Sequence, residues 1–399
     1  MRLSEVQESV EDLASREAVF SHLERNVNDF RGNWEKFSDI SYQFSPESGC
    51  TVQVPFKFVD NEAVTTKSAE PDNRITEVLL VGEAACYFWH PDTVSPFNDP
   101  EDGVLDVLPT SSTRTLQTTG LPYNFFIKTH LPKRHFLYDR SLKPSVVSHS
   151  IDVSHDIERL TSESTDESWA FMPESLAFIL EGSGVIFRER EPRPHVQQPR
   201  LLLPAFSLYS KDTKNPDDPS LLSQLIHHNG EDDPLQYMLD KIVTPLRSVW
   251  LEILRKRGLL LELHAQNALF ELNNSGDVER VVLRDFQSIW SDIDIREKNN
   301  LPQMSRDGFL PEERNKQYSL CYDHFMGTMF LRHLVNVFLQ EFDQYHAEEV
   351  NKIIAQDFRT IAPDIIESMS EVETFRMAHG PHQISGQGPV PSGSPPVYR

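Results

Sequence analysis

The sequence predicts a mixed α/β (α+β) protein with a β-rich N-terminal lobe and a mainly helical C-terminal lobe. Short apolar runs rich in β-branched residues, such as 183–190 (SGVIFRER), lie in the first half of the chain and are typical of buried strands. The second half carries apolar residues at helical spacing over 232–258 and 318–356. At 399 residues, the chain is long enough for two or three lobes with substantial cores.

A proline-rich segment, 191–199 (EPRPHVQQP), divides the chain, because prolines interrupt helices and central strands. The elements predicted before it are a helical region from 1 to about 40, a strand from Ile75 onward (ITEVLLVGEAACYFW), a strand over 123–131 (YNFFIKTHL), and a helix from Asp156 or Ile157 with Ser154 as its N-cap.

After this divide, the sequence predicts a helix over 232–258 that ends at Gly258, a residue suited to a left-handed C-cap. The segment 268–286 (ALFELNNSGDVERVVLRDF) is typical of a β-hairpin, since an Asn-Asn-Ser-Gly-Asp turn separates two apolar runs. The predicted organisation is a helical segment at 1–75, a β-rich lobe at 76–195, a second lobe at 196–377, and a disordered Gly/Pro/Ser-rich tail at 378–399.

Charge and composition exclude several classes of partner. The chain has 38 basic and 61 acidic residues, a formal net charge of −23, and such a charge repels nucleic-acid phosphates and anionic membranes. No apolar run approaches the roughly 20 residues needed to cross a bilayer, and the acidic N-terminus (MRLSEVQESVEDL) is unlike a signal peptide. The three cysteines lack metal-site spacing. We therefore expect a cytoplasmic protein with no nucleic-acid or membrane partner.

Polar residues concentrate where the predicted hairpin begins. Glu262, His264 and Gln266 alternate with apolar residues, so an extended backbone would place them on one face. The hairpin then returns Asp285 to the neighbourhood of Asn267. Amide and carboxylate oxygens are ligands that Mg²⁺ accepts together with nucleotide phosphates, and a nearby histidine can contact phosphate or ribose. This arrangement predicts a nucleotide site with a magnesium ion.

The same layout resembles small-molecule kinases of the aminoglycoside-phosphotransferase type, which carry a His-x-Asp…Asn loop before a hairpin. In those enzymes the Asp orients or deprotonates the acceptor hydroxyl, and here the corresponding residue is Gln266. An amide cannot accept that proton, whereas a carboxylate substrate is already ionised at neutral pH and needs no base. Gln266 therefore favours activation of a carboxylate over phosphorylation of a hydroxyl.

A second group of residues is basic and rich in hydroxyls. The segment 111–115 (SSTRT) is followed by Lys128, Lys133, Arg134 and Arg140 in an otherwise acidic chain. Guanidinium forks and lysine ammonium groups match phosphate oxygens and stabilise the charge that develops on phosphorus. The alternative is a solvated face that balances nearby acids, and this segment alone does not decide between the two.

Together these motifs resemble the NRPS-independent siderophore (NIS) synthetases of the IucA/IucC, aerobactin synthetase-like, family. The segment SSTRTL at 111–116 resembles the family's Ser-x-Arg-Thr element, and Lys128 with Arg140 resembles its Lys…Arg element. ELHAQN at 262–267 with RDF at 284–286 resembles the E-x-H-x-Q-N…R-D-F signature, the most specific of the three. Weaker similarities are FWHP at 88–91 and FREREP at 187–192.

The resemblance implies a hand-like, multi-lobed fold with the nucleotide site between the β-rich and helical lobes, and with ATP and Mg²⁺ as cofactors. Carried over by position, the triphosphate contacts would be Ser112, Arg114, Thr115, Lys128 and Arg140, the nucleotide contacts His264, Gln266 and Asn267, and the magnesium ligands Glu262, Asp285 and Asn267. The resemblance assigns catalytic roles to His264, Arg114, Lys128 and Arg140.

The reaction implied is the adenylation of a citrate-like or other small carboxylic acid and its condensation with an amine or alcohol, as in siderophore biosynthesis. The chain departs from the family in its shorter length, in lacking the N-terminal Gly-His-Pro-x-His-Pro element, and in having Thr113 where an apolar residue is more common. The resemblance therefore does not identify the acid or the nucleophile. Two alternatives stay open, a kinase with a diverged loop and a nucleotide-binding pseudo-enzyme. Dimers are common in the family, which makes a homodimer a further expectation.

Overall fold

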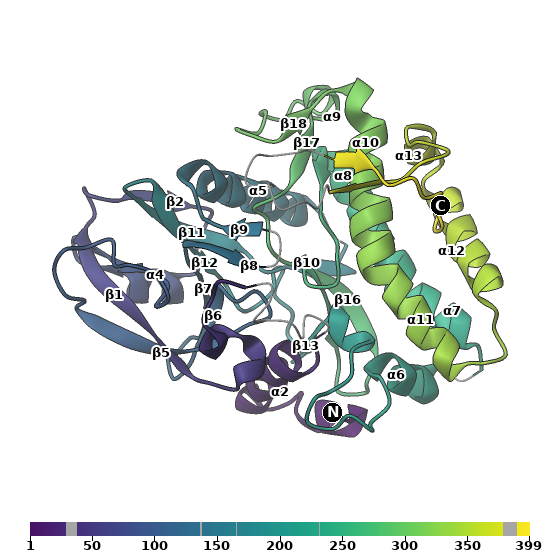
Figure 1. The fold of residues 1–399 in the computed structure, drawn as a ribbon, viewed down its shortest axis with the longest axis horizontal. Coiled ribbons are helices and arrows are strands. Elements are labelled where there is room, and N and C mark those ends of the chain that lie inside the picture. Colours follow the sequence, from purple (N-terminus) through teal and green to yellow (C-terminus); the bar gives the residue numbers. More distant parts are fainter. Residues whose placement is uncertain (29–37, 136–137, 165, 231, 378–388) are drawn as a thin grey trace.

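The computed structural model describes residues 1–399 except 29–37, 136–137, 165, 231 and 378–388. A β-rich lobe built mainly from the first half of the chain lies beside a helical lobe built from the second half, with a smaller sheet between them (Figure 1). The predicted mixed α/β architecture with these two lobes is confirmed.

The β-rich lobe is built on one large antiparallel sheet. Its strands among the described residues are, in spatial order, β2 (Thr65–Ser68), β11 (Glu174–Leu180), β12 (Ser183–Arg188), β7 (Phe126–Lys128), β6 (Thr115–Thr118), β5 (Gly103–Pro109), β1 (Val52–Asp60), β4 (Ala84–Phe88) and β3 (Leu80–Val81). The helix α5 (Pro144–Glu163) packs against β11 and β12, and α4 (Asn73–Leu79) lies beside β3 and β4.

Strand β11 shows why the sheet is stable. Successive side chains of a strand point to opposite faces, and here both faces are covered. Phe178 joins the large aromatic core of the sheet, whereas Ala177 packs with Val147 and Ile151 of α5. A strand that is buried on both faces is apolar throughout, which is why SLAFIL carries no polar residue after its first serine.

A four-stranded sheet connects the two lobes. Its order is β10 (Trp169–Phe171), β16 (Val278–Leu283), β15 (Ala268–Leu272) and β13 (Leu201–Pro204), with β10 and β16 parallel and the other pairs antiparallel. The predicted hairpin is confirmed, since β15 pairs with β16. Its turn is held by Asn273, whose Oδ1 accepts hydrogen bonds from the backbone N–H groups of Ser275 and Asp277, each at 2.9 Å.

The helical lobe surrounds the far side of this sheet. Its elements are the 3₁₀ turn η3 (Ala205–Leu208), α6 (Leu221–Asn229), α7 (Pro234–Met238), the π-helical turn η4 (Leu239–Val243), α8 (Thr244–Arg257), α9 (Ile293–Lys298), the 3₁₀ turn η5 (Pro311–Glu313), α10 (Arg314–Ser319), the π-helical segment η6 (Leu320–Leu331), α11 (Arg332–Glu341), α12 (Ala347–Ile361) and α13 (Pro363–Glu367). As predicted, α8 ends at Gly258, which adopts φ 63°.

Short elements complete the fold. These are the 3₁₀ turns η1 (Tyr42–Phe44) and η2 (Pro46–Ser48), the pair β8 (Leu131–His135) and β9 (Tyr138–Arg140), the small sheet β14 (Leu259–Leu260), β17 (Trp290–Asp292) and β18 (Gly308–Phe309), and the pair β19 (Phe375–Met377) and β20 (Pro389–Pro391).

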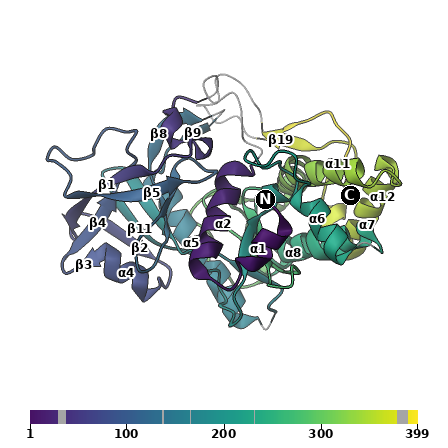
Figure 2. The ribbon, with the colours of Figure 1, turned by 90° about the horizontal axis from the view of Figure 1, so that it is seen from below.

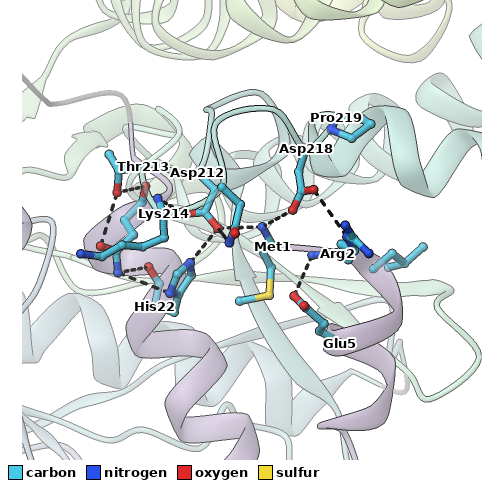
Figure 3. A network of polar contacts seen from close by, with 12 residues as sticks. Met1, Arg2, Glu5, His22, Asp212, Thr213, Lys214, Asp218 and Pro219 are labelled. Carbon is cyan, nitrogen blue, oxygen red and sulfur yellow. Dashed lines mark hydrogen bonds and ion pairs between the residues drawn. The ribbon is translucent and has the colours of Figure 1, made fainter.

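The N-terminal helices α1 (Leu3–Glu8) and α2 (Leu13–Asn26) lie across the boundary between the lobes, as the view from below shows (Figure 2). A polar network fastens them to the loop before α6 (Figure 3). The Met1 amine lies 2.6 Å from Asp212 and 3.0 Å from Asp218, and His22 lies 2.9 Å from Asp212. The N-terminal segment is therefore part of the packed structure.

Several predicted elements differ from the structure. Residues 73–79 form α4 and not a strand, because Asp72 caps a helix by accepting a hydrogen bond from the N–H of Arg74. The helix expected at Asp156 begins earlier, at Pro144, so Ser154 lies within it and is not its cap. Residues 52–60 and 65–68 of the segment expected to be helical form β1 and β2.

The tail expected to be disordered is only partly covered by the structure. Residues 378–388 lie outside the described residues, whereas 389–391 pair as β20 with β19. Tyr398 and Arg399 are buried against the helical lobe, where Arg399 lies 3.0 Å from Asp323. The Gly/Pro/Ser-rich composition of this segment predicted disorder, because composition alone does not reveal contacts with a helix that is distant in the sequence.

Candidate functional site

Three segments far apart in the sequence meet at the boundary between the β-rich lobe and the central sheet. They are the β5–β6 loop (110–114), the segment before β15 (261–267) and the turn after β16 (284–287). Gln266 Nε2 donates to Ser111 Oγ at 3.2 Å, and Arg284 Nε donates to the Gln266 carbonyl at 2.7 Å. The structure thus brings the two groups of site residues inferred from the sequence together at one place.

A small pocket opens where these segments meet, and hydrogen-bond donors dominate its wall. It is lined by Thr110, Ser111, Ser112, Thr115, Phe126, Arg188, Gln266, Asn267, Arg284 and Asp285. Arg188 Nε and Arg284 Nη2 are buried and have no hydrogen-bond partner among the described residues. An unsatisfied buried donor is unfavourable by about 1–3 kcal/mol, so these guanidinium groups fit an anionic ligand such as a phosphate.

A network of four charges, of which Asp285 alone is partly exposed, forms one side of the pocket. Lys128 Nζ lies 2.6 Å from Asp285 and 3.2 Å from Glu174, and Arg188 Nη2 lies 2.6 Å from Glu174. Burial would raise the pKa of Asp285, but the charges of Lys128 and Arg188 outweigh it and hold this pKa well below its usual range. Asp285 is therefore ionised at neutral pH.

Glu174 is the fully buried centre of this network. Besides the two cations, it accepts hydrogen bonds from Ser150 and from the backbone N–H of Phe286 at 3.3 Å. Lys128 is buried as well, and burial lowers its pKa while Asp285 and Glu174 oppose that effect. Two carboxylates facing two cations give a compensated charge cluster, which is how proteins tolerate buried ions.

The segment 262–267 places the other expected residues beside Asp285. His264 Nδ1 accepts a hydrogen bond from the N–H of Gln266 at 3.2 Å, which leaves the ring proton on Nε2. Burial lowers the pKa of His264 to about 4, so the ring is neutral at pH 7. Asn267 Nδ2 donates to the Glu262 carbonyl at 3.1 Å, which leaves its Oδ1 for another partner.

Glu262 differs from Asp285 in that its pKa is raised and not lowered. Burial raises the pKa of this carboxyl to about 8, with repulsion from Asp285 and Asp307 contributing. A cation held between Glu262 and Asp285 would relieve that repulsion.

Stability should therefore depend on pH through Glu262. Its folded-state pKa of about 8 exceeds the ordinary value of 4.5, so the unfolded chain binds fewer protons between these values and stability falls as pH rises. We expect Glu262→Gln to flatten this part of the pH dependence, measured as the urea midpoint at about pH 5 and about pH 8 with the wild-type protein as the reference. If the urea midpoint of Glu262→Gln changes between these two pH values as much as that of wild type, the raised pKa does not belong to Glu262.

Arg114 and Arg140 form a second basic group behind the pocket. Arg114 Nη1 donates to the Arg140 carbonyl at 2.5 Å, and Arg114 Nη2 donates to Gln287 Oε1 at 2.7 Å. Burial lowers the pKa of Arg114 to about 10, and the charge of Arg140 adds to this. In the pocket itself, Thr115 Oγ1 donates to Ser112 Oγ at 3.2 Å. The bonds of Arg114 to carbonyl groups make it a brace for the loop as well as a positive charge.

Two other members of the basic segment lie in ordinary ion pairs. Lys133 lies 2.9 Å from Asp92, and the exposed Arg134 lies 3.5 Å from Asp39. Neither lines the pocket. These two residues balance nearby acids, as the solvated-face alternative describes.

Two residues at or beside the site have an unusual backbone conformation. Thr113 has φ 61° and Asp285 has φ 71°, a region that non-glycine residues rarely adopt and that is especially unfavourable for a β-branched threonine. Such conformations cluster at functional sites because surrounding contacts enforce them. At Asp285 the conformation turns the chain sharply after β16.

Two residues of the candidate site were not predicted from the sequence. Glu174 lies at the start of β11 with no motif around it, and Glu24 lies in α2, more than eighty residues before the pocket loop that it contacts. Arg188 falls within FREREP, one of the weaker similarities. An acid beside an apolar run, as in PESLAFIL, is the one signal in the sequence that could have pointed to Glu174.

A magnesium site would use oxygens from Glu262, Asp285 and Asn267. Among the described residues, no three His, Cys, Asp or Glu side chains gather into a metal cluster. Two carboxylates and an amide nevertheless suit Mg²⁺, which takes its remaining ligands from water and phosphates. Burial is the main cause of the raised pKa of Glu262, and repulsion from Asp285 and Asp307 adds to it. A bound cation would offset that repulsion.

Solved structures with this fold include proteins of siderophore biosynthesis. The petrobactin biosynthesis protein AsbB from Bacillus anthracis str. Sterne aligns with a TM-score of 0.68 at 14% identity, over 92% of this chain and 74% of that one. The chain has the siderophore-synthetase fold. The ATP-bound aerobactin synthetase IucA from Klebsiella pneumoniae gives 0.65 at 14% identity over 94% and 77%, and IucC gives 0.62 at 17% over 82% and 66%. The fold implied by the motifs is confirmed.

Part of the chain also matches a family model. Residues 235–347 match a family model described as ferric iron reductase FhuF-like transporter. This match covers less than half of the chain and includes His264 and Asp285. No curated protein sequence is similar to the chain. Among the described residues, no helix has both the length and the apolar character that a membrane span requires.

Proposed function

We propose that this protein is an ATP-dependent synthetase that adenylates a small carboxylic acid and condenses it with an amine or alcohol, as in siderophore biosynthesis. The observation that carries the proposal is the pocket between the lobes, where Ser111, Ser112 and Thr115 meet Arg188 and Arg284. The Ser112 hydroxyl and the two guanidinium groups can donate hydrogen bonds to the phosphates of a nucleotide. Ser111 and Thr115 instead donate within the wall of the pocket. The siderophore-synthetase fold supports the same reaction class.

The charged residues would act on the leaving pyrophosphate and on the α-phosphate. Arg188, Arg284 and Lys128 would stabilise the negative charge that develops as the acid attacks phosphorus. His264 is neutral and would donate a hydrogen bond from Nε2 without adding charge. Magnesium, held by Asp285, Glu262 and Asn267, would neutralise phosphate charge. The acid needs no base, because its carboxylate is ionised at neutral pH.

The position of Gln266 favours this reaction over phosphorylation of a hydroxyl. Its side-chain amide donates to Ser111 Oγ, and its carbonyl accepts from Arg284. The side chain is thus part of the wall of the pocket, and it has no group that could accept a proton from an alcohol. A kinase would need a base from elsewhere in the site.

The products of the reaction test the proposal. We expect ATP–pyrophosphate exchange that depends on Mg²⁺ and on one member of a panel of acids, including citrate, succinate and 2-oxoglutarate, with AMP as the nucleotide product after an amine is added. Formation of ADP with a hydroxylated acceptor would instead indicate a kinase. ATP binding without exchange on any acid of a broad panel would indicate a pseudo-enzyme.

A further inference from the structure

A closed ring of polar contacts joins the N-terminal helix α2 to the pocket. Glu24 Oε2 accepts hydrogen bonds from Ser111 N at 3.1 Å and from Ser111 Oγ at 2.7 Å, while Glu24 Oε1 lies 2.6 Å from Arg284 Nη1. Gln266 closes the ring with two hydrogen bonds. Its side-chain amide donates to Ser111 Oγ, and its backbone carbonyl accepts from Arg284 Nε. Three of the four members line the pocket, and Glu24 lies behind them.

From this ring we infer that Glu24 is a positioning residue for the nucleotide site. The inference rests on the proposed function and extends it to the N-terminal helix. Glu24 is almost fully buried, with 1% of its surface exposed, so its carboxylate is held by these contacts and not by water. It fixes the Ser111 hydroxyl and one edge of the Arg284 guanidinium, which leaves Arg284 Nη2 unpartnered among the described residues for an anion.

The charge of Glu24 is needed as well as its shape. Both of its oxygens face donors, namely the N–H and hydroxyl of Ser111 on one side and a guanidinium on the other. An ionised carboxylate only accepts hydrogen bonds, whereas a glutamine of the same size must turn an NH₂ group towards one of these donors. Either orientation of the amide opens the ring.

The placement of α2 explains why this residue comes from the N-terminus. The helix lies across the boundary between the lobes (Figure 2). Glu17 of the same helix pairs with Arg190 and accepts from Asn124 at 2.8 Å on the β-rich side. Phe20 packs on Phe126, a pocket residue, with ring centroids 6.0 Å apart. Glu24 then contacts the β-rich lobe through Ser111 and the central sheet through Arg284.

Equilibrium binding of ATP, measured by isothermal titration calorimetry with Mg²⁺ and no acid, tests this role. We expect Glu24→Gln to weaken ATP binding at least about tenfold, the usual effect of losing a charge-assisted hydrogen bond. The matched control is Glu17→Gln, which removes a carboxylate from the same helix without touching the ring, and it should bind ATP within about twofold of wild type. In steady-state assays the KM for ATP should rise while the KM for the acid stays unchanged.

A second variant guards against misfolding. Ser111→Ala opens the ring without disturbing the buried charge, and its effect should not add to that of Glu24→Gln in the double variant. If wild type fails to bind ATP, the proposed function and this role both fail. If wild type binds but Glu24→Gln binds equally well or more tightly, the positioning role alone is wrong. Equal losses in Glu24→Gln and Glu17→Gln would show that docking of α2 matters and that Glu24 has no separate role.

Discussion

Replacing Asp285 with asparagine should reduce ATP–pyrophosphate exchange by about a hundredfold to a thousandfold, the range seen when one charge-stabilising group is removed from an active site. Asp285 lies 2.6 Å from Lys128 and lines the pocket, and it is the ionised partner of Glu262 in the proposed magnesium site. An amide keeps the shape of the side chain but loses its charge. Lys128 should therefore be less well oriented, and the affinity for Mg²⁺ should fall.

The control for this substitution is Asp277→Asn. Asp277 lies on the same hairpin at the opposite end, in the turn between β15 and β16. It should retain the wild-type exchange rate and the wild-type far-UV circular dichroism. Exchange within about threefold of wild type in Asp285→Asn would refute the proposed site, because a bystander aspartate would account for such a small change.

Local patterns in the sequence predicted the elements whose structure depends on neighbouring residues. The hairpin over 268–286 and the C-cap at Gly258 follow from turn and cap chemistry within a few positions, and both are present. The strand expected from Ile75 is present only in its later part, as β3 and β4, whereas its first residues, 75–79, form α4. The run ITEVLL is apolar enough for either state. The cap at Asp72, which lies just outside the apolar run, decided for the helix.

The candidate site could be predicted from the sequence where its residues lie in contiguous motifs. The segments 111–115 and 262–267 meet in space as the pairing of their motifs suggested. Glu24 and Glu174 could not be found in this way, because each acts through contacts with residues distant in sequence. An isolated glutamate in an amphipathic helix is usually a solvated residue. The fold alone shows that Glu24 is buried.

Glu174→Gln should destabilise the protein by about 3–5 kcal/mol, the usual result of removing one partner from a buried ion pair. Glu174 is fully buried and lies 3.2 Å from Lys128 and 2.6 Å from Arg188. Without its charge, two buried cations share Asp285 alone. The measurement is the free energy of unfolding from urea denaturation at neutral pH. The matched control is Glu191→Gln, whose 2.8 Å pair with Arg74 is exposed, and exposed pairs contribute about 0–1 kcal/mol.

Removing one of the cations should restore part of the loss. In the double variant Glu174→Gln with Lys128→Met, the partly buried carboxylate of Asp285 faces the buried guanidinium of Arg188, so the charges balance again. We therefore expect the double variant to be more stable than Glu174→Gln, although Lys128→Met alone destabilises the wild-type network by leaving Glu174 and Asp285 to share Arg188. Such a sign reversal is the signature of coupled charges. If the effects of the two substitutions on the free energy of unfolding are instead additive, the four residues do not act as one network. The stability of this wall of the pocket would then have another source.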